Sequence, residues 1–154
     1  MPINAAFQPQ DPHYDQRVRA SFERQAAMKT IGASITVIEP GRVVIELPYS
    51  PALTQQHGFL HAGMIATGLD SACGYAAFSL MPAQAGVLTI EYKINLVAPG
   101  KGQLFRMEGE VIKPGRTITV VEGRAYAVDV GKDKLIATMT ATEMTITGRD
   151  DVQH

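Results

Sequence analysis

A long uncharged stretch with one acid near its centre constrains this chain more than any other feature. From Leu47 to Ile90 the only formally charged side chain is Asp70, and residues 61–81 around it are otherwise apolar or uncharged, many of them small. A helix that is apolar nearly all round is buried in a protein core, and an aspartate is almost never fully buried without a partner. Burial should raise the pKa of Asp70, which makes this residue a candidate catalytic group.

Asp70 also has a structural interpretation. It can be an acid at an interface between subunits, satisfied by Thr67, by Ser71 or by a partner chain. By themselves, the residues around Asp70 slightly favour this structural interpretation.

Composition limits the classes of protein to consider. A chain of 154 residues is enough for one domain with a sizeable core. The formal net charge of −1 gives no case for a nucleic-acid partner or an anionic membrane surface. Residues 61–81 approach the length of a membrane span, but Asp70 and three glycines favour burial in a soluble core. The single cysteine, Cys73, and the lack of a secretory signal pattern predict a cytoplasmic protein.

The pattern of apolar residues and turn signals predicts an arm at 1–14, a single domain at 15–148 and a tail at 149–154. A short amphipathic helix is expected over residues 15–27, and the buried helix over residues 61–81. The expected strands are 31–37 and 42–48, which form a hairpin, and then 87–97, 103–112, 117–128 and 134–146, which form an antiparallel meander. This order is α+β rather than alternating βαβ. We expect a curved sheet to wrap the buried helix, and a second copy to cover the rest.

A motif at the start of the buried helix supports this fold. Residues 55–63 read Gln-Gln-His-Gly-Phe-Leu-His-Ala-Gly, and Asp70 follows. The pattern resembles the acyl-CoA thioesterases of the phenylacetate-degradation (PaaI-like) group, which show an Asn or Gln, then His-Gly-Gly, then an acid one to two helical turns onward. Gln55, His61, Gly63 and Asp70 match, whereas Ala62 stands in place of a glycine. The resemblance covers about residues 32–146 and implies a hotdog fold.

The resemblance implies a role for each matching residue in the hydrolysis of a thioester. Asp70 is the general base or the nucleophile. The backbone N–H groups at Ala62 and Gly63 lie at the positive end of the helix dipole and polarise the carbonyl. Gln55 orients the water or the thioester. His61 is either a helix cap or a contact to the substrate.

Two downstream segments extend the resemblance. Thr89 heads a strand, from which it can hydrogen-bond Asp70 or the attacking water. The turn Lys113-Pro114-Gly115-Arg116 matches the basic turn of the family. Its cations are either ordinary solvated charges or, beside the Gly115 backbone, a grip for the phosphates of coenzyme A. Coenzyme A is then part of the substrate, and no separate cofactor is expected.

The spacing along the buried helix predicts self-association. At a rise of 1.5 Å per residue, Ala62 and Asp70 lie about 12 Å apart and are too distant to act on one carbonyl. In the resembling family the site is completed across a dimer. We therefore expect a homodimer, or a dimer of dimers.

Other functions fit the residues less well. His57 and His61 have a zinc-ligand spacing, but Gly58 and the proline-containing loop argue against a helix through both, so no metal is expected. Cys73 has no histidine placed locally to activate it. An acyl-CoA hydratase or dehydratase of the same fold needs an acid five residues before His61, where this chain has Gln56. A non-catalytic acyl-CoA-binding protein would need no competent acid, whereas Asp70 is present.

Overall fold

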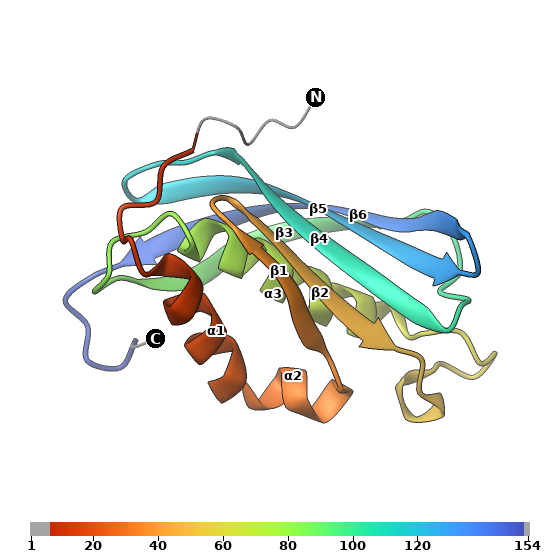
Figure 1. Ribbon diagram of the computed structural model, residues 1–154. Coiled ribbons are helices and arrows are strands. Elements are labelled where there is room, and N and C mark those ends of the chain that lie inside the picture. The colour runs from red at the N-terminus through yellow and green to blue at the C-terminus, as the bar shows by residue number, and fades with distance from the viewer. Residues whose placement is uncertain (1–6, 153–154) are drawn as a thin grey trace.

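One helix packed against a curved sheet organises the computed structural model, which describes residues 7–152 (Figure 1). The elements follow the chain in the order α1 (Tyr14–Arg24), α2 (Ala26–Ile31), β1 (Ser34–Glu39), β2 (Arg42–Pro48), a short 3-10 helix (Pro51–Leu53), α3 (Ala62–Phe78), β3 (Gly86–Leu96), β4 (Leu104–Lys113), β5 (Ile118–Asp129) and β6 (Lys132–Ile146). All strand pairs are antiparallel, so the expected α+β hotdog class is confirmed.

The strand order corrects the expected meander. The sheet runs β1-β2-β4-β5-β6-β3. Of the four strands expected in the meander, only β4, β5 and β6 are neighbours in chain order, whereas β3 pairs with β6 at the far edge. Turn residues at 99–100 show that the chain changes direction there, but they do not say which strand it will join. The connection between the end of β3 at Leu96 and the start of β4 at Leu104 crosses from the edge of the sheet to its middle. Among the described strands, β3 therefore has one neighbour.

The N-terminal region also differs from the expected single helix and strand. The helix is interrupted at Gln25, whose backbone is extended, and Ile31 belongs to α2 rather than to a strand. Gln25 is held there by α3, because its Oε1 accepts from Ser71 and its Nε2 donates to the Tyr75 hydroxyl, both at 3.0 Å. These tertiary contacts account for the break between α1 and α2, which local helix propensity does not reveal.

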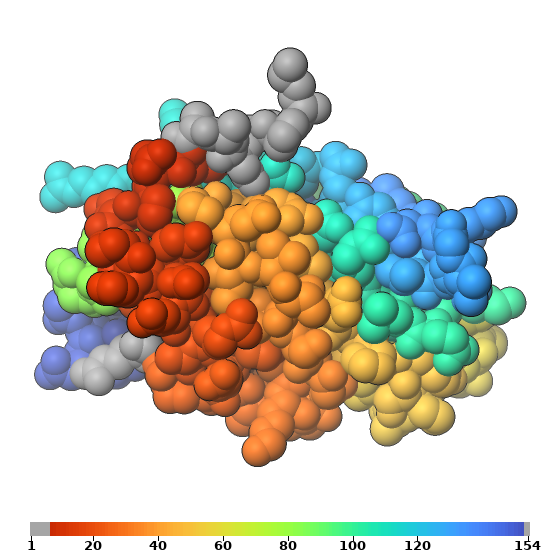
Figure 2. Space-filling view, viewed as in Figure 1, coloured from red at the N-terminus to blue at the C-terminus, as the bar shows by residue number. Residues whose placement is uncertain are grey.

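Figure 2 shows α1, α2 and the β1–β2 hairpin side by side on one face.

The end of α3 is fixed by a charged side chain from α1. Arg17 donates hydrogen bonds to the carbonyl oxygens of Phe78, Met81 and Pro82 at 2.9–3.1 Å. Its Nε lies 3.0 Å from the carboxylate of Asp11, which is itself buried. A cation at the C-terminal end of a helix satisfies carbonyl groups that have no partner inside the helix and complements the helix dipole. Residues 10–17 are thus attached to α3, and Gln10 adds a hydrogen bond to Leu80.

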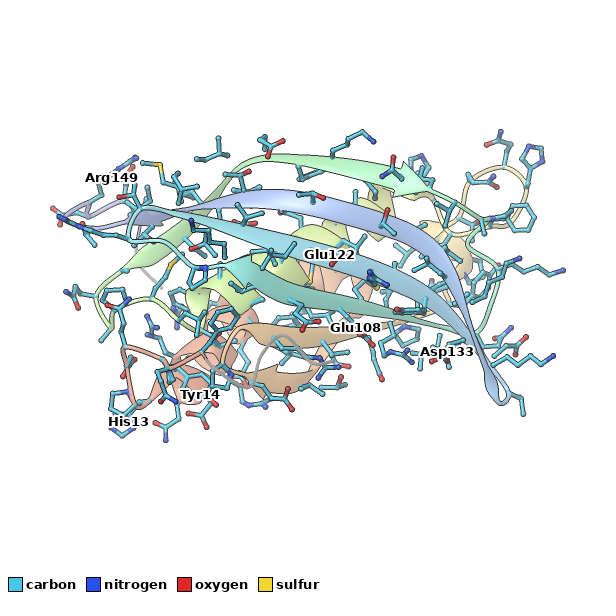
Figure 3. All side chains as sticks on the ribbon, turned by 90° about the horizontal axis from the view of Figure 1, so that it is seen from above. His13, Tyr14, Glu108, Glu122, Asp133 and Arg149 are labelled. Carbon is cyan, nitrogen blue, oxygen red and sulfur yellow. The ribbon has the colours of Figure 1, made fainter. Side chains whose placement is uncertain are left out.

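Two glycines let α3 lie very close to the sheet. Gly109 of β4 and Gly123 of β5 are directly paired. A Cβ atom on Gly109 would overlap the backbone of Ala72 and Cys73, and one on Gly123 would lie 2.9 Å from the Cys73 sulfur. The helix backbone therefore rests on the sheet backbone at this point. The outer face of the sheet, which bears Glu108 and Glu122, is seen in Figure 3.

The contact at Gly109 gives a prediction for stability. Gly109→Ala should lower the free energy of unfolding by about 1–3 kcal/mol, because the added methyl group meets main-chain atoms that cannot rotate away. Urea unfolding followed by circular dichroism measures the difference.

Gly74→Ala in α3 is the matched control for that prediction. Its Cβ would lie 3.8 Å from its nearest neighbour, an ordinary contact. Because alanine favours a helix over glycine by about 1 kcal/mol, this variant should be as stable as the wild type or more so. Equal stability of Gly109→Ala and the wild type would contradict the close approach.

Candidate active site

Asp70 lies on the face of α3 that is turned toward the start of β3. The Thr89 hydroxyl lies 2.8 Å from Asp70 Oδ1 and can donate to it. Asp70 is half-buried. Burial raises the pKa of its carboxyl group, and the hydrogen bond from Thr89 opposes that rise. The two residues that the sequence analysis placed together are therefore in contact.

A second carboxyl group, which the sequence analysis missed, completes this cluster. Glu143 of β6 is fully buried, and Thr89 Oγ1 lies 3.0 Å from its Oε2. Burial raises the pKa of Glu143 to about 7, the hydrogen bond with Thr89 acts in the opposite direction, and the charge of Asp70 adds to the rise. Two carboxyl groups thus share one hydroxyl.

The strand pattern around Glu143 contains a signal for its position. Ala137, Met139 and Ala141 precede it at every second position and are buried against α3. Because side chains alternate between the two faces of a strand, Glu143 continues the inward row. A buried acid could have been inferred from the sequence on this ground.

A bulge in β3 decides which of its residues face α3. The pairing with β6 shifts between Thr89 and Glu91, so Ile90 is the extra residue. Thr89 is opposite Glu143, and after the bulge Tyr92 is opposite Ala141. Thr89 and Tyr92 therefore share the inner face, although strict alternation would separate them.

An open cavity of about 350 Å³ surrounds Asp70. It is lined by residues from the α1–α2 junction, α3, β3 and β6: Gln25, Asp70, Ser71, Gly74, Tyr75, Val87, Leu88, Thr89 and Glu143. Among these described residues there is no Lys, Arg or His. The acids of this cavity are thus not neutralised by a neighbouring cation.

The start of α3 offers one backbone donor. His61 Nδ1 accepts from the Gly63 N–H at 2.8 Å, and the His61 carbonyl accepts from the N–H groups of Met64 and Ile65. His61 is therefore the N-terminal cap of α3, which is one of the two roles expected for it from the sequence. Within residues 7–152 the Ala62 N–H has no recorded acceptor. Of the two donors expected at Ala62 and Gly63, only the one at Ala62 is unoccupied.

Gln55 lies beside that donor, in a second cavity of about 430 Å³ that Ala62 also lines. Its Oε1 accepts from the backbone N–H groups of His57 and Phe59, at 2.5 and 3.3 Å. With this assignment the amide NH₂ group has no acceptor within residues 7–152 and is a candidate donor. Gln55 and Ala62, each with an unused N–H donor within the described residues, thus line one cavity.

The basic turn lies near the start of β3 but outside the Asp70 cavity. Lys113, Gly115 and Arg116 are exposed, and the Thr117 carbonyl accepts from Thr145 on β6. A Cβ on Gly115 would overlap the Ile118 carbonyl, so the tight turn by itself requires glycine there. No ion pair is recorded for Lys113 or Arg116 within the described residues.

Metal and thiol chemistry find no support in the part of the chain that is described. No group of three His, Cys, Asp or Glu residues is placed to hold a metal ion there. Cys73 is fully buried, and burial followed by the charge of Glu143 raises the pKa of its thiol well above the usual value. A buried thiol with a raised pKa is a poor nucleophile. None of the described helices is both long and apolar enough to span a membrane.

Comparison with known proteins defines the class. Residues 57–134 match the family model described as the thioesterase superfamily. A predicted esterase of Saccharolobus solfataricus is 37% identical over 94 residues, which cover 61% of this chain and 66% of that protein. A second predicted esterase of that organism is 31% identical over 71% of this chain and 72% of its own length. The chain belongs to the thioesterase superfamily.

Solved structures agree with this assignment. A thioesterase family protein from Silicibacter pomeroyi shares 57% identity at a TM-score of 0.86, covering 88% of this chain and 99% of its own. The PaaI protein of E. coli, from the phenylacetic acid degradation operon, has a TM-score of 0.80 with 19% identity, covering 90% of this chain and 97% of its own. The second likeness concerns the fold, which is the PaaI-like fold that the motif suggested.

The buried acid gives a prediction for stability against pH. The pKa of Glu143 is about 7 in the folded protein, against an ordinary value of 4.5. The folded state therefore holds more protons than the unfolded state between these values, and stability falls as the pH rises through this window. Glu143→Gln cannot ionise at this position. Its free energy of unfolding should therefore exceed that of the wild type by about 1–3 kcal/mol at pH 8.

Chemical denaturation at a series of pH values measures this difference. The gain of Glu143→Gln should shrink steadily as the pH is lowered from about 7 toward 4.5. Glu110→Gln, on the outer face of the same sheet, is the control and should show no such trend. A pH-independent difference for Glu143→Gln would contradict the buried titration.

Proposed function

We propose that this protein is an acyl-CoA thioesterase, in which Asp70 activates water or attacks the thioester directly. The observation that carries the proposal is the half-buried Asp70, whose Oδ1 is hydrogen-bonded to Thr89 inside an open cavity. Within residues 7–152 no hydrogen bond is recorded for its other oxygen, Oδ2. An anchored carboxylate with one oxygen available is what a general base requires.

The edge strand β3 supplies a reason to expect a dimer. Among residues 7–152 only β6 pairs with β3, and apolar side chains on β3 are exposed, with Tyr92 at 44% and Leu96 at 50%. The start of β3 at Thr89 lines the Asp70 cavity, and its end at Leu96 lines the Ala62 cavity. If two copies pair antiparallel along β3, the start of each strand meets the end of the other.

Such a two-fold pairing assembles a complete site from two incomplete ones. Asp70 of one subunit would face the Ala62 N–H and the Gln55 amide of the other. Ala62 and Asp70 of one chain lie about 12 Å apart along α3, which is too far for both to act on a single carbonyl. Pairing of two chains removes this difficulty, because the two groups then come from different subunits. We therefore propose a homodimer as the functional unit, with pairing into a tetramer as an extension of it.

The reaction follows from these groups. The thioester carbonyl oxygen accepts from the Ala62 N–H and the Gln55 amide, which stabilise the negative charge that develops there. Asp70 takes a proton from water as the oxygen forms a bond to the carbonyl carbon. The C–S bond then breaks, and the thiolate leaves with that proton, giving a free acid and a thiol. In the nucleophilic variant Asp70 attacks the carbonyl carbon, and the C–S bond breaks to release the thiolate and leave a mixed anhydride. Water then hydrolyses the anhydride to the free acid and the Asp70 carboxylate, and the remaining proton goes to the thiolate.

We propose that Lys113 and Arg116 contact the phosphates of coenzyme A. Both cations are exposed, and their turn lies at the end of the sheet where β3 begins. Charge-assisted hydrogen bonds to phosphate suit such exposed cations. The acyl group itself would occupy one of the two open cavities.

Replacement of the acid tests the activity. Asp70→Asn should lower kcat for an acyl-CoA substrate by about 10²–10⁴-fold and change KM little, since the amide keeps the shape but cannot take a proton. Release of free thiol from a panel of aryl, short-chain and long-chain acyl-CoAs measures both constants. Asp129→Asn, at the exposed turn between β5 and β6, is the matched control and should retain full activity.

Near wild-type turnover by Asp70→Asn would overturn its assignment as base or nucleophile. Tight acyl-CoA binding by the wild type without hydrolysis of any member of the panel would instead indicate a binding protein.

A charge on β3 tests the dimer. Tyr92→Glu places an acid on the exposed part of this edge strand, and two such charges would meet near the two-fold axis. The variant should sediment as a monomer at micromolar concentration and lose activity, whereas the wild type should sediment as a dimer or larger. Val130→Glu, fully exposed at the far turn, should change neither property. A fully active monomer would contradict the shared site.

A further inference from the structure

The Thr89 hydroxyl lies between two carboxyl groups, which limits where protons can be. Its oxygen is 2.8 Å from Asp70 Oδ1 and 3.0 Å from Glu143 Oε2. A hydroxyl group has one hydrogen to donate. If both acids were ionised, one of the two contacts would be a pair of oxygen atoms with no hydrogen between them. Both contacts are hydrogen bonds only when one carboxyl group is protonated and donates to Thr89.

The surroundings decide which of the two acids holds the proton. Glu143 is fully buried, whereas Asp70 is half-buried at an open cavity, so water can stabilise a charge on Asp70 better. Titratable groups that face Glu143 come from α3 and are Asp70 and Cys73. From the flanking strands it meets Thr89 of β3 and Thr119 of β5, both uncharged. No cation among the described residues offsets a charge on Glu143.

We propose that Glu143 is a positioning residue whose neutral carboxyl group donates to Thr89, so that the Thr89 hydroxyl donates in turn to the ionised Asp70. This proposal rests on the proposed function, because it assigns the protonation state in which Asp70 acts. The chain of two hydrogen bonds occupies Oδ1 and leaves Oδ2 free for water or the thioester. It also fixes the rotation of the Thr89 hydroxyl, which would otherwise have two acceptors.

This order of protons, with Glu143 neutral and Asp70 ionised, predicts that activity falls at alkaline pH. When Glu143 ionises, the Thr89 hydrogen serves two anions, and a second negative charge lies beside Asp70. Asp70 is then no longer held in one arrangement, and an approaching hydroxide or developing oxyanion is repelled. Because the pKa of Glu143 is about 7, the loss should begin near neutral pH. The two acids titrate as a coupled pair, so the profile reports the pair.

The pH dependence of kcat/KM tests the proposal in the full-length protein. The kcat/KM of the wild type should fall at least about fivefold between pH 6.5 and 8.5. Free thiol release from an acyl-CoA at constant ionic strength measures it. Glu143→Gln carries an amide that can donate to Thr89 at any pH. It should lose less than about twofold over the same range and keep at least about a fifth of the wild-type value at pH 6.5.

Two further variants separate positioning from packing. Glu143→Leu fills the space but cannot donate. It should lower kcat/KM by at least about tenfold at pH 6.5, where the wild-type Glu143 is neutral, while its circular dichroism spectrum stays that of the wild type. Glu110→Gln should keep the wild-type profile. An alkaline loss in Glu143→Gln equal to that of the wild type would falsify the proposal, as would equal rates for Glu143→Gln and Glu143→Leu.

A measurement without substrate keeps this test separate from that of the proposed function. In a ¹³C NMR titration of the carboxyl carbons, one glutamate should titrate near pH 7 in the wild type and be missing from Glu143→Gln. If the protein hydrolyses no acyl-CoA but this signal is present, the proposed function fails while the order of protons stands. If the enzyme is active but no glutamate titrates above about pH 6, the order of protons is wrong.

Discussion

The contact between α3 and the glycine pair Gly109–Gly123 is the constraint on which the site depends. With no side chain between them, the backbone of the helix rests on the backbone of β4 and β5, and the remaining strands curve around it. This short separation brings Asp70, in the middle of α3, within one hydroxyl group of both β3 and β6. A helix set one methyl group further away would leave the two acids without a common partner. The chemistry of the site is thus a consequence of main-chain packing.

Much of this fold could be predicted from the sequence, because burial leaves a local trace. The uncharged stretch around Asp70 gave the central helix, and alternating apolar residues gave strands close to their observed bounds. The position of β3 beside β6 could not be predicted in this way, since it depends on a crossover that turn residues do not encode. The bulge at Ile90 and the extended backbone at Gln25 could not be predicted either, because the first is seen only in the pairing with β6 and the second is held by contacts with α3. Glu143 differs from these cases, because the alternation of β6 in the sequence already places it on the inner face of the sheet. It was missed because an acid is ordinarily assigned to the solvent face.

The two cavities hold different groups of the proposed reaction, one at the start of α3 and the other at its middle. At its start, His61 uses the Gly63 N–H and leaves the Ala62 N–H, so an alanine in place of the family's glycine keeps the single donor that is available. In its middle, Asp70 and Glu143 provide acids with unequal exposure to water. Donors without an acid and an acid without donors are each incomplete. The exposed edge of β3 runs from one to the other, and for this reason assembly and activity are expected to depend on the same strand.

Arg17 ties this central helix to the N-terminal segment, with a consequence for how the protein can be altered. One guanidinium group, which Asp11 holds in place, donates to the carbonyl of Phe78, the last residue of α3, and to those of Met81 and Pro82 just after it. The first helix therefore holds the end of the helix that carries Asp70 in place. A fusion or trimmed variant that disturbs residues 11–17 would let the last turn of α3 fray. Because Asp70 lies on the same helix, residues 11–17 should be left intact when the protein is fused to another or shortened.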